Sequence, residues 1–427
     1  MPIGLTSYRI STTLLRPVLG LVLNHRIAQG KERNASRLDR FAKGQPTPPR
    51  QRPLIWLHAA SVGESRLQLA VAQGLCRQSD TPLGLLFTCQ TDTAAGMIRE
   101  AIATDPTLSE HWTHQSMAPF DTPGVAKRFI AHWQPDLAIF AEGEIWPNLL
   151  IALRRTPSRS ALINARMTEK SLKGWLRWPT TSKFLFSKFN VLLASDLRTA
   201  TGLSALSGRT VTPIGNLKSA LPPPVADPME VEKLRAQIGH RSVLVAASTH
   251  QGEEALSVDA LMLMKDRPFL IIAPRHPERG DDIAALLRCS EFNVVRRTEG
   301  TQITPQTDIL LADTLGEMGL WYRLADTVYL GGGHAPGIGG HNPLEAVQLG
   351  KPVLTGPGVF NFAELTQDLM RRGGVTFVAD SSDLAAQFPA QPPPASLLSF
   401  LADTAQGPMG ETLSALASNL TSDGAGA

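Results

Sequence analysis

One carboxylate near the start of the chain stands in a short turn between two patterned segments. The turn is Ser61-Val62-Gly63-Glu64; an extended apolar run, 53–60, precedes it, and an amphipathic helical pattern begins at Arg66. The S-x-x-E spacing predicts a capping box, in which Glu64 ties down the start of the helix. A carboxylate at the end of a strand would also suit a general base. The residues alone favour the cap.

Further charged side chains follow other strand-like runs of the first half. The run DLAIFAE is followed by EGEIWPN, which contains Glu142, Glu144 and Trp146, and GNLK places Lys218 just before a proline-rich stretch. In parallel α/β sheets, ligands bind at the carboxyl ends of the strands. These loops are therefore the candidates for chemistry.

Arg275 and His276 come directly after an apolar run of the second half, LIIAP. They could supply charge-assisted hydrogen bonds to a phosphate or a carboxylate. An Arg-His pair at the end of a strand is more often structural when it stands alone. Its importance depends on whether the same half contains a second element that binds anions.

That second element is the segment GGHNPLEAVQLG, 339–350. Asn342 is a good N-cap, Pro343 suits the first helical position, and Glu345 stands three residues after the cap. A helix N-terminus preceded by glycines offers N–H groups to a phosphate, although Asn342 and Glu345 could equally form only a capping pair. Two such elements in one half favour a nucleotide donor.

The sequence gives little support for a bound metal ion. It has no Asp-x-Asp and no His/Cys cluster, and its three cysteines are scattered, at Cys76, Cys89 and Cys289. We therefore expect no metal, no disulfide framework and a reducing compartment.

Ten short apolar runs alternate with helical patterns along the chain, which predicts βαβ units and parallel sheets. A proline-rich connector, 221–228, separates two halves of similar size. We expect an N-terminal segment at 1–52, a Rossmann-like domain at 53–220, and a second at 229–427 that ends in a helix. The two Rossmann-like domains should face each other across a cleft.

The N-terminal segment is basic. Residues 1–52 hold ten Lys or Arg against two acids, or +8, so that with an overall charge of +3 the rest carries −5. The apolar stretch 14–23 is too short to span a bilayer, which needs about 20 residues, and no convincing signal-peptide cleavage site follows it. An interfacial membrane anchor is favoured over a helix packed on the protein itself.

A second basic stretch, 154–188, holds nine Lys or Arg and one acid, and aromatic residues from Trp175 to Phe189 are interleaved with them. It is either a solvated face beside ordinary core aromatics or a surface for a phosphorylated, membrane-embedded acceptor. No segment resembles a nucleic-acid-binding module, so nucleic acid is not expected as a partner.

Several motifs, in order from Trp56 to Glu364, together resemble the 3-deoxy-D-manno-octulosonic acid (Kdo) transferase family. They are WLHAASVGE, EGEIWPN, NARMTEKS, GNLK, STHQGEE, PRHPER, DTLGEMGLWY and GGHNPLEAVQLGKPVLTGP with FNFAE. The resemblance implies a GT-B glycosyltransferase at the cytoplasmic face of a Gram-negative inner membrane. Such enzymes transfer Kdo from CMP-Kdo to the tetraacyldisaccharide precursor of lipid A, in lipopolysaccharide biosynthesis, with inversion and without a cofactor.

The resemblance also implies roles for individual residues. The proton acceptor falls on Glu64, and the groups that stabilise the transition state fall on Lys218 and on Glu142 or Glu144, a choice that stays open. Contacts to CMP fall on Arg275, His276, Gly316, Glu317, Met318, Asn342, Pro343, Leu344 and Glu345. With the resemblance, Glu64 is expected to be both cap and base, with a pKa lowered by the helix N-terminus.

Two other functions compete with this one. A different GT-B nucleotide-sugar transferase acting on a membrane acceptor would share the architecture, but not HAASVGE together with EGEIWPN. A non-catalytic, membrane-associated protein of the same fold should have lost Glu64, Lys218 or Arg275, and all three are present. A dinucleotide oxidoreductase is disfavoured, because no G-x-G-x-x-G follows an early strand.

Overall fold

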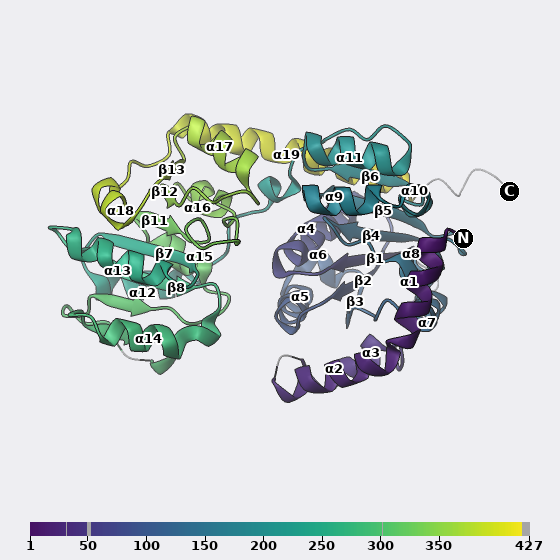
Figure 1. The fold of residues 1–427 in the computed structure, drawn as a ribbon, viewed down its shortest axis with the longest axis horizontal. Helices are drawn as coiled ribbons and strands as arrows, with labels where there is room; N and C mark the ends of the chain where they lie inside the picture. The colour runs from purple at the N-terminus through teal and green to yellow at the C-terminus, as the bar shows by residue number, and fades with distance from the viewer. Residues whose placement is uncertain (31, 49–52, 301, 421–427) are drawn as a thin grey trace. The chain divides into compact units, whose positions relative to one another are not determined.

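The computed structural model describes residues 1–30, 32–48, 53–300 and 302–420, which form two compact units. The first unit comprises Met1–Leu221 and the described residues from Thr404 onward, and the second comprises Pro222–Asp403. In Figure 1 the first is drawn mainly in purple to teal and the second in green to yellow. Each is described below by itself.

The first unit is built on a parallel sheet whose described strands run in the order β3-β2-β1-β4-β5-β6. The strands are β1 (Leu54–Ala59), β2 (Gly84–Cys89), β3 (Trp112–Met117), β4 (Leu137–Ala141), β5 (Arg159–Ala165) and β6 (Val191–Ala194). This order is that of a Rossmann-like fold, in which the direction of winding reverses between β1 and β4. Loops that follow these two strands therefore diverge at a natural binding site.

Helices cover both faces of this sheet (Figure 1). They are α1 (Ile3–Leu14), α2 (Arg16–Ala28), α3 (Ser36–Arg40), α4 (Val62–Gln78), α5 (Asp92–Thr104), α6 (Pro106–Ser109), α7 (Pro123–Trp133), α8 (Pro147–Leu153), α9 (Glu169–Leu176), α10 (Pro179–Phe186) and α11 (Leu197–Ser207), with the 3-10 helix η1 (Leu217–Ala220). Because both faces are covered, the inner strands β1, β2, β4 and β5 are buried along almost their whole length, with no alternation of buried and exposed residues.

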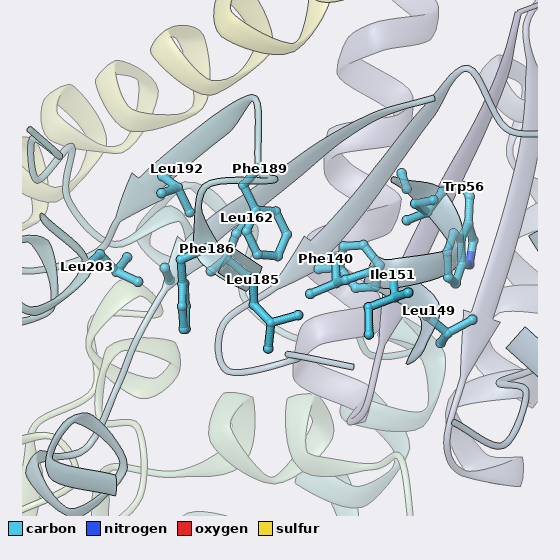
Figure 2. Close-up of a cluster of buried hydrophobic side chains, with 14 of the residues drawn as sticks. Trp56, Phe140, Leu149, Ile151, Leu162, Leu185, Phe186, Phe189, Leu192 and Leu203 are labelled. Carbon is cyan, nitrogen blue, oxygen red and sulfur yellow. The ribbon is translucent and has the colours of Figure 1, made fainter. Parts of the chain in front are cut away.

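Two apolar cores lie on the two faces of the sheet. Trp56 and Phe140 belong to one core, whereas their strand neighbours Leu57 and Ile139 belong to the other. Figure 2 shows the first core, where Trp56, Phe140, Leu162 and residues of α8 and α10 meet. Alternation of side chains along each strand distributes them between the cores, and these cores fix the strand ends that carry the candidate site.

The second unit contains a parallel sheet in the order β13-β12-β11-β7-β8-β10-β9. Its strands are β7 (Val243–Thr249), β8 (Phe269–Pro274), β9 (Val294–Arg296), β10 (Ile309–Leu311), β11 (Thr327–Leu330), β12 (Val353–Thr355) and β13 (Val375–Phe377). The helices are α12 (Pro228–Ile238), α13 (Glu253–Leu263), α14 (Gly280–Arg288), α15 (Met318–Leu324), α16 (Leu344–Gln348), α17 (Ala363–Arg371) and α18 (Ser381–Gln387), with 3-10 helices η2 (Pro277–Arg279) and η3 (Arg297–Glu299). Here the winding reverses between β7 and β11.

The ten apolar runs expected to be strands all form strands, and the structure adds three that the sequence analysis missed. β3 carries polar, partly exposed residues at the edge of the first sheet, and β10 and β13 are three residues long. Apolar periodicity is a weak signal for such strands, because an edge strand needs few apolar residues; of the four three-residue strands in the described residues, only β9 and β12 were predicted.

The last helix, α19 (Ala395–Ser418), crosses the division between the units at Asp403. Leu413 and Leu416 are buried in a core of the first unit, whereas the sequence analysis placed all of 229–427 in the second domain. That boundary is corrected: the two leucines lie in the first unit because burying them there removes apolar surface from water. Residues 31 and 49–52 of the expected N-terminal segment, and residues 301 and 421–427 of the expected second domain, lie outside the described part of the chain.

The basic N-terminal segment forms two helices that meet at Leu15, with Pro17 in the first turn of α2. Leu5 and Leu23 are buried, whereas Ile3, Ile10, Leu14, Leu15, Val18, Leu21 and Val22 are exposed. In the described residues, we find no helix with both the length and the apolar character needed to cross a membrane. The segment thus packs on the protein and also presents apolar side chains outward.

The basic stretch 154–188 contains both core aromatics and exposed residues. Phe186 and Phe189 are buried core residues, and the guanidinium of Arg154 lies 4.2 Å from the centre of the Phe184 ring. Trp178, in contrast, is 57% exposed. Two of the phenylalanines are therefore ordinary core, while Trp178 belongs to the surface.

The connector packs so closely on α15 that only glycine fits at position 319. A Cβ on Gly319 would overlap the backbone carbonyls of Pro224 and Val225. We expect Gly319→Ala to destabilise the protein by about 2–3 kcal/mol, because backbone atoms cannot give way as a side chain would. Thermal unfolding followed by circular dichroism measures the change.

Gly174→Ala is the matched control for that substitution. Gly174 also lies in a helix, α9, but a Cβ there meets nothing within 4 Å. Since alanine is the better helix former, the control should be stabilised by about 0.5–1 kcal/mol. Equal melting temperatures for Gly319→Ala and the unmodified protein would contradict the proposed packing.

Candidate active site

Glu64 lies at the start of α4, directly after β1. The hydroxyl of Ser61 accepts a hydrogen bond from the backbone N–H of Glu64 (3.2 Å) and donates one to Glu64 Oε1 (3.0 Å). Glu64 Oε2 accepts from the backbone N–H of Ala60 at 2.8 Å. The predicted cap is confirmed, with the carboxylate reaching to the N–H of Ala60, one residue before the N-cap.

The environment of Glu64 favours the protonated acid. The pKa of Glu64 is raised to about 7. Burial is the largest cause, and the negative charges of Glu142 and Glu144 add to it, whereas the hydrogen bond from the N–H of Ala60 opposes it. The expectation of a lowered pKa is therefore wrong. The helix N-terminus and the cap stabilise the carboxylate, but with 8% of the residue exposed the loss of hydration outweighs them.

Glu142 and Lys218 form a close ion pair. Lys218 Nζ lies 2.6 Å from Glu142 Oε1, and both side chains are about one fifth exposed. Glu142 has a left-handed backbone (φ +54°), which is rare for a residue with a side chain and costs energy that neighbouring contacts must offset. This pairing brings together two residues that are far apart in the sequence.

Asn164, at the end of β5, supports both members of that pair. Its Nδ2 lies 3.4 Å from Glu142 Oε1, and its Oδ1 accepts from the backbone N–H of Leu217 at 2.9 Å. Asn216 then accepts from the N–H of Lys218 through its side chain (3.0 Å), which starts η1. Asn164 was not identified from the sequence, although it lies in the motif NARMTEKS.

Glu144 is held by two residues that the sequence analysis gave no role. Its Oε2 accepts from Trp146 Nε1 at 2.8 Å and lies 3.3 Å from His58 Nε2. His58 Nδ1 in turn contacts the hydroxyl of Thr88 at 2.8 Å. If His58 is neutral, an ionised Glu144 requires the proton on Nε2, so Nδ1 accepts from Thr88. A histidine inside an apolar strand was the available signal.

In the first unit, the structure therefore gathers Glu64, Glu142, Glu144 and Lys218 at the carboxyl ends of β1, β4 and β5, where the winding of the sheet reverses. Three carboxylates with one ammonium can take up a proton and stabilise a developing positive charge. The pKa of the buried Glu64, raised to about 7, suits a base that acts at neutral pH.

In the second unit, a buried carboxylate organises the loop after β11. Glu253 is 1% exposed, and its carboxylate accepts from the backbone N–H groups of Gly332 (2.8 Å), His334 (3.0 Å) and His250 (2.9 Å). Gly332 has φ +82°, a conformation that glycine adopts without strain. Glu253 thus fixes the two loops that diverge at the second reversal of winding.

Three histidines gather beside this loop. Nε2 of His250 lies 2.8 Å from Nε2 of His341, their rings are stacked, and the ring of His276 is 5.8 Å from that of His250. The pKa of His341 is lowered to about 4, mainly by burial and in smaller part by the nearby His250 and Arg275. Arg275 and His276 are exposed at the end of β8. The predicted anion-binding pair therefore lies next to the segment that begins at His341.

The helix expected after Asn342 is short. Asn342 Oδ1 accepts from the backbone N–H of Leu344 at 3.2 Å, and α16 runs only from Leu344 to Gln348, with Pro343 just before it. The N-cap residue is Pro343, which makes no side-chain cap, so the prediction of Asn342 as N-cap is wrong and the helix starts one residue later than the sequence pattern indicates. Glu345 lies in its first turn.

Glu317 is already paired in the structure. Its carboxylate accepts from both terminal and internal nitrogens of Arg297 (2.7 and 3.2 Å) and from the hydroxyl of Thr314. Gly316 has φ +86°, and Met318 begins α15. The loop expected to contact CMP is therefore held by Arg297, a residue that the sequence did not single out.

In the described part of the chain, no group of three or more His, Cys, Asp or Glu side chains is arranged to hold a metal ion.

Comparisons with known proteins place this chain among sugar transferases. Residues 32–221 match the family described as 3-deoxy-D-manno-octulosonic-acid transferase (kdotransferase). The 3-deoxy-D-manno-octulosonic acid transferase of Bordetella pertussis is 33% identical over 350 residues, or 79% of this chain and 80% of the relative. A probable mitochondrial 3-deoxy-D-manno-octulosonic acid transferase of Arabidopsis thaliana is 31% identical over 404 residues, 90% of this chain and 87% of the relative.

Among solved structures, the UDP-GlcNAc 2-epimerase of Neisseria meningitidis, bound to UDP-GlcNAc, aligns with a TM-score of 0.53. It is 14% identical and is matched over 86% of this chain and 99% of its own. At this identity the likeness concerns the fold alone, which is of the GT-B class with two parallel-sheet α/β domains. The extent and identity of the sequence matches show that this chain belongs to the 3-deoxy-D-manno-octulosonic acid transferase family of glycosyltransferases.

Proposed function

We propose that the protein transfers Kdo from CMP-Kdo to the tetraacyldisaccharide precursor of lipid A, in lipopolysaccharide core biosynthesis, with inversion and without a metal ion. The observation that carries this proposal is the cluster of Glu64, Glu142, Glu144 and Lys218 at the reversal of winding in the first unit. A base of pKa about 7 beside an ammonium suits removal of a proton from a sugar hydroxyl.

In this mechanism the acceptor hydroxyl oxygen attacks the anomeric carbon of Kdo while the bond from that carbon to the phosphate oxygen of CMP breaks. The hydroxyl proton passes to Glu64, and CMP leaves with the bonding electrons as a phosphate dianion. Lys218 and one or both of Glu142 and Glu144 stabilise the charges that develop in the transition state. Glu144 is oriented for this by His58 and Trp146.

We assign donor binding to the second unit. Arg275 and His276 contact the phosphate, and Gly316, Glu317, Met318, Asn342, Pro343, Leu344 and Glu345 form the rest of the CMP site. The exposure of Arg275 beside the histidine cluster supports this assignment, because its guanidinium is accessible to an anion. Glu345, and Glu317 if it exchanges contacts with Arg297, would accept hydrogen bonds from ribose hydroxyls.

Arg275→Ala should weaken CMP binding about 10- to 100-fold, since a charge-assisted hydrogen bond contributes about 1.5–3 kcal/mol. Isothermal titration of the full chain with CMP measures this. The control is Arg267→Ala, an exposed arginine of the same unit whose guanidinium pairs with Glu291 at 2.6 Å. A CMP affinity within twofold of the unmodified protein for Arg275→Ala would remove that residue from the donor site.

We further propose that the protein lies on the cytoplasmic face of the inner membrane through α1 and α2. Their exposed apolar side chains, among them Ile10, Leu14 and Leu21, are flanked by Arg9, Arg16 and Arg26. Apolar insertion and attraction of arginines to anionic lipids would act together at such a surface. The acceptor, embedded in that membrane, would then be presented to the first unit.

The test of the proposed reaction is transfer of radiolabelled Kdo from CMP-Kdo, generated in situ, to tetraacyldisaccharide bisphosphate, with EDTA present. Transfer by the purified protein would support the donor, the acceptor and independence from metal. A folded protein that binds CMP but transfers no Kdo would point to a different donor sugar or acceptor within the GT-B class. A protein that binds neither substrate would favour a non-catalytic role.

A further inference from the structure

Helix α1 presents two different faces. One face, toward the body of the first unit, carries Leu5, Tyr8 and Thr12, spaced three and four residues apart. Leu5 is buried, and Tyr8 and Thr12 form hydrogen bonds with other residues of the unit. Ile10 and Leu14 are exposed, at 56% and 73%. Figure 1 shows α1 running beside α7 and α8. One helix thus joins an outward apolar surface to the interior of the unit.

The inward face of α1 ends on a buried carboxylate, Asp121, which is 7% exposed. Asp121 Oδ2 accepts from the hydroxyl of Tyr8 at 2.9 Å. Thr12 contributes a second link, because its Oγ1 accepts from Asn148 Nδ2 at 3.2 Å, while the same Nδ2 donates to the backbone carbonyl of Asp121 at 2.7 Å. Burial raises the pKa of Asp121, and its hydrogen-bond donors oppose that rise.

Asp121 caps α8 from a distant part of the chain. Its carboxylate accepts from the backbone N–H groups of Asn148 (3.1 Å) and Leu149 (2.8 Å), in the first turn of a helix whose own N-cap residue, Trp146, makes no side-chain cap. These N–H groups have no partner within the helix, so Asp121 decides where α8 begins. Each hydrogen bond that the Asp121 carboxylate accepts helps to hold it at the start of α8.

The start of α8 is also the end of the candidate active-site loop. Trp146 precedes the helix and donates through Nε1 to Glu144 Oε2, and the same oxygen faces His58. The chain of contacts therefore runs from Tyr8 to Asp121, to the first turn of α8, and through Trp146 to Glu144. Each step is a hydrogen bond or a peptide link.

We propose that α1 is part of the catalytic apparatus, with Tyr8 acting as a positioning residue that sets Glu144 through Asp121 and the start of α8. The inference rests on the proposed function, because Glu144 matters only if the carboxylate cluster performs the transfer. Without the Tyr8 hydroxyl, the buried carboxylate keeps one donor fewer and moves or becomes protonated. Either change loosens the N–H groups that it caps.

The test compares Tyr8→Phe with the unmodified full-length protein, using acceptor dispersed in detergent so that membrane binding does not limit the rate. We expect kcat to fall about three- to tenfold, with KM for both substrates within twofold, since the effect concerns geometry at the reacting centre. The control is Thr13→Ala, which removes an exposed hydroxyl of the same helix that bonds only to Arg9 O. Its kcat should equal that of the unmodified protein.

A second measurement separates positioning from a general loss of stability. The fluorescence of Trp146, obtained as the difference between each protein and its Trp146→Phe variant, should change in Tyr8→Phe but not in Thr13→Ala. In kcat, Tyr8→Phe and Trp146→Phe should be non-additive, because both act through Glu144. If the unmodified protein is active and Tyr8→Phe changes neither kcat nor the fluorescence of Trp146, this inference is wrong while the proposed function stands. No transfer by the unmodified protein would instead overturn the proposed function, and the fluorescence comparison would still decide whether Tyr8 sets the loop.

Discussion

Replacing Glu64 by glutamine is expected to lower kcat/KM about 10³-fold, within the usual range for loss of a general base. Glutamine keeps the size of the side chain and can keep its cap: the amide oxygen still accepts from the N–H of Ala60, and the amide nitrogen donates to Ser61 Oγ. The loss of rate would then report the missing proton acceptor rather than a displaced helix. Kdo transfer by the purified variant measures it.

The pH dependence of the unmodified protein gives the same prediction an independent test. A base must be ionised to act, and burial has raised the pKa of Glu64 to about 7. The rate at low substrate concentration should therefore rise with pH through about 7 and then level off. A rate that is independent of pH between 5 and 8, or a Glu64→Gln variant with more than a tenth of the normal activity, would leave Glu64 as a cap only.

Stability should change with pH in the opposite direction. A folded-state pKa of about 7, above the ordinary value of 4.5, means that the folded protein holds this proton more tightly than the unfolded chain. The resulting stability is complete below pH 4.5 and is lost as the pH rises through 7. Glu64→Gln has no proton to lose, so its melting temperature should fall less between pH 5 and 8.

The position of Glu64 could be predicted from the sequence, but its chemistry could not. A strand followed by S-x-x-E specifies a helix start, because capping is a contact between residues three positions apart. The sign of the pKa shift depends instead on burial and on Glu142 and Glu144, which arrive from another strand. Such tertiary contributions leave no trace in the local pattern.

The same distinction explains what the sequence missed elsewhere. Most of the ten predicted strands were evident as apolar runs buried on both faces, whereas β3 carries polar, partly exposed residues at the edge of its sheet. The pairing of Glu317 with Arg297 joins loops that are 20 residues apart, and the burial of Leu413 in the first unit joins the two ends of the chain. None of these contacts follows from propensity or spacing.

Lys218→Gln is expected to lower kcat about 10²- to 10³-fold with little effect on folding. The ammonium lies 2.6 Å from Glu142 and is about one fifth exposed, so its charge is poorly screened and acts strongly on any charge that develops beside it. Glutamine retains a hydrogen-bond donor toward Glu142 but not the charge. The decrease should appear in single-turnover transfer, where neither substrate binding nor product release limits the rate.

Lys173→Gln provides the matched control, because it removes the same charge from a Lys–Glu pair of the same length. Lys173 Nζ lies 2.6 Å from Glu169 Oε1, but both side chains are 70% exposed. Water screens that pair, so its loss should leave both the stability and the rate essentially unchanged. If both lysine variants kept full activity, Lys218 would serve only to neutralise Glu142, and the search for the cation that stabilises the transition state would move to the arginines of the first unit. A loss confined to Lys218→Gln would instead establish that burial and position, rather than charge alone, make this ammonium catalytic.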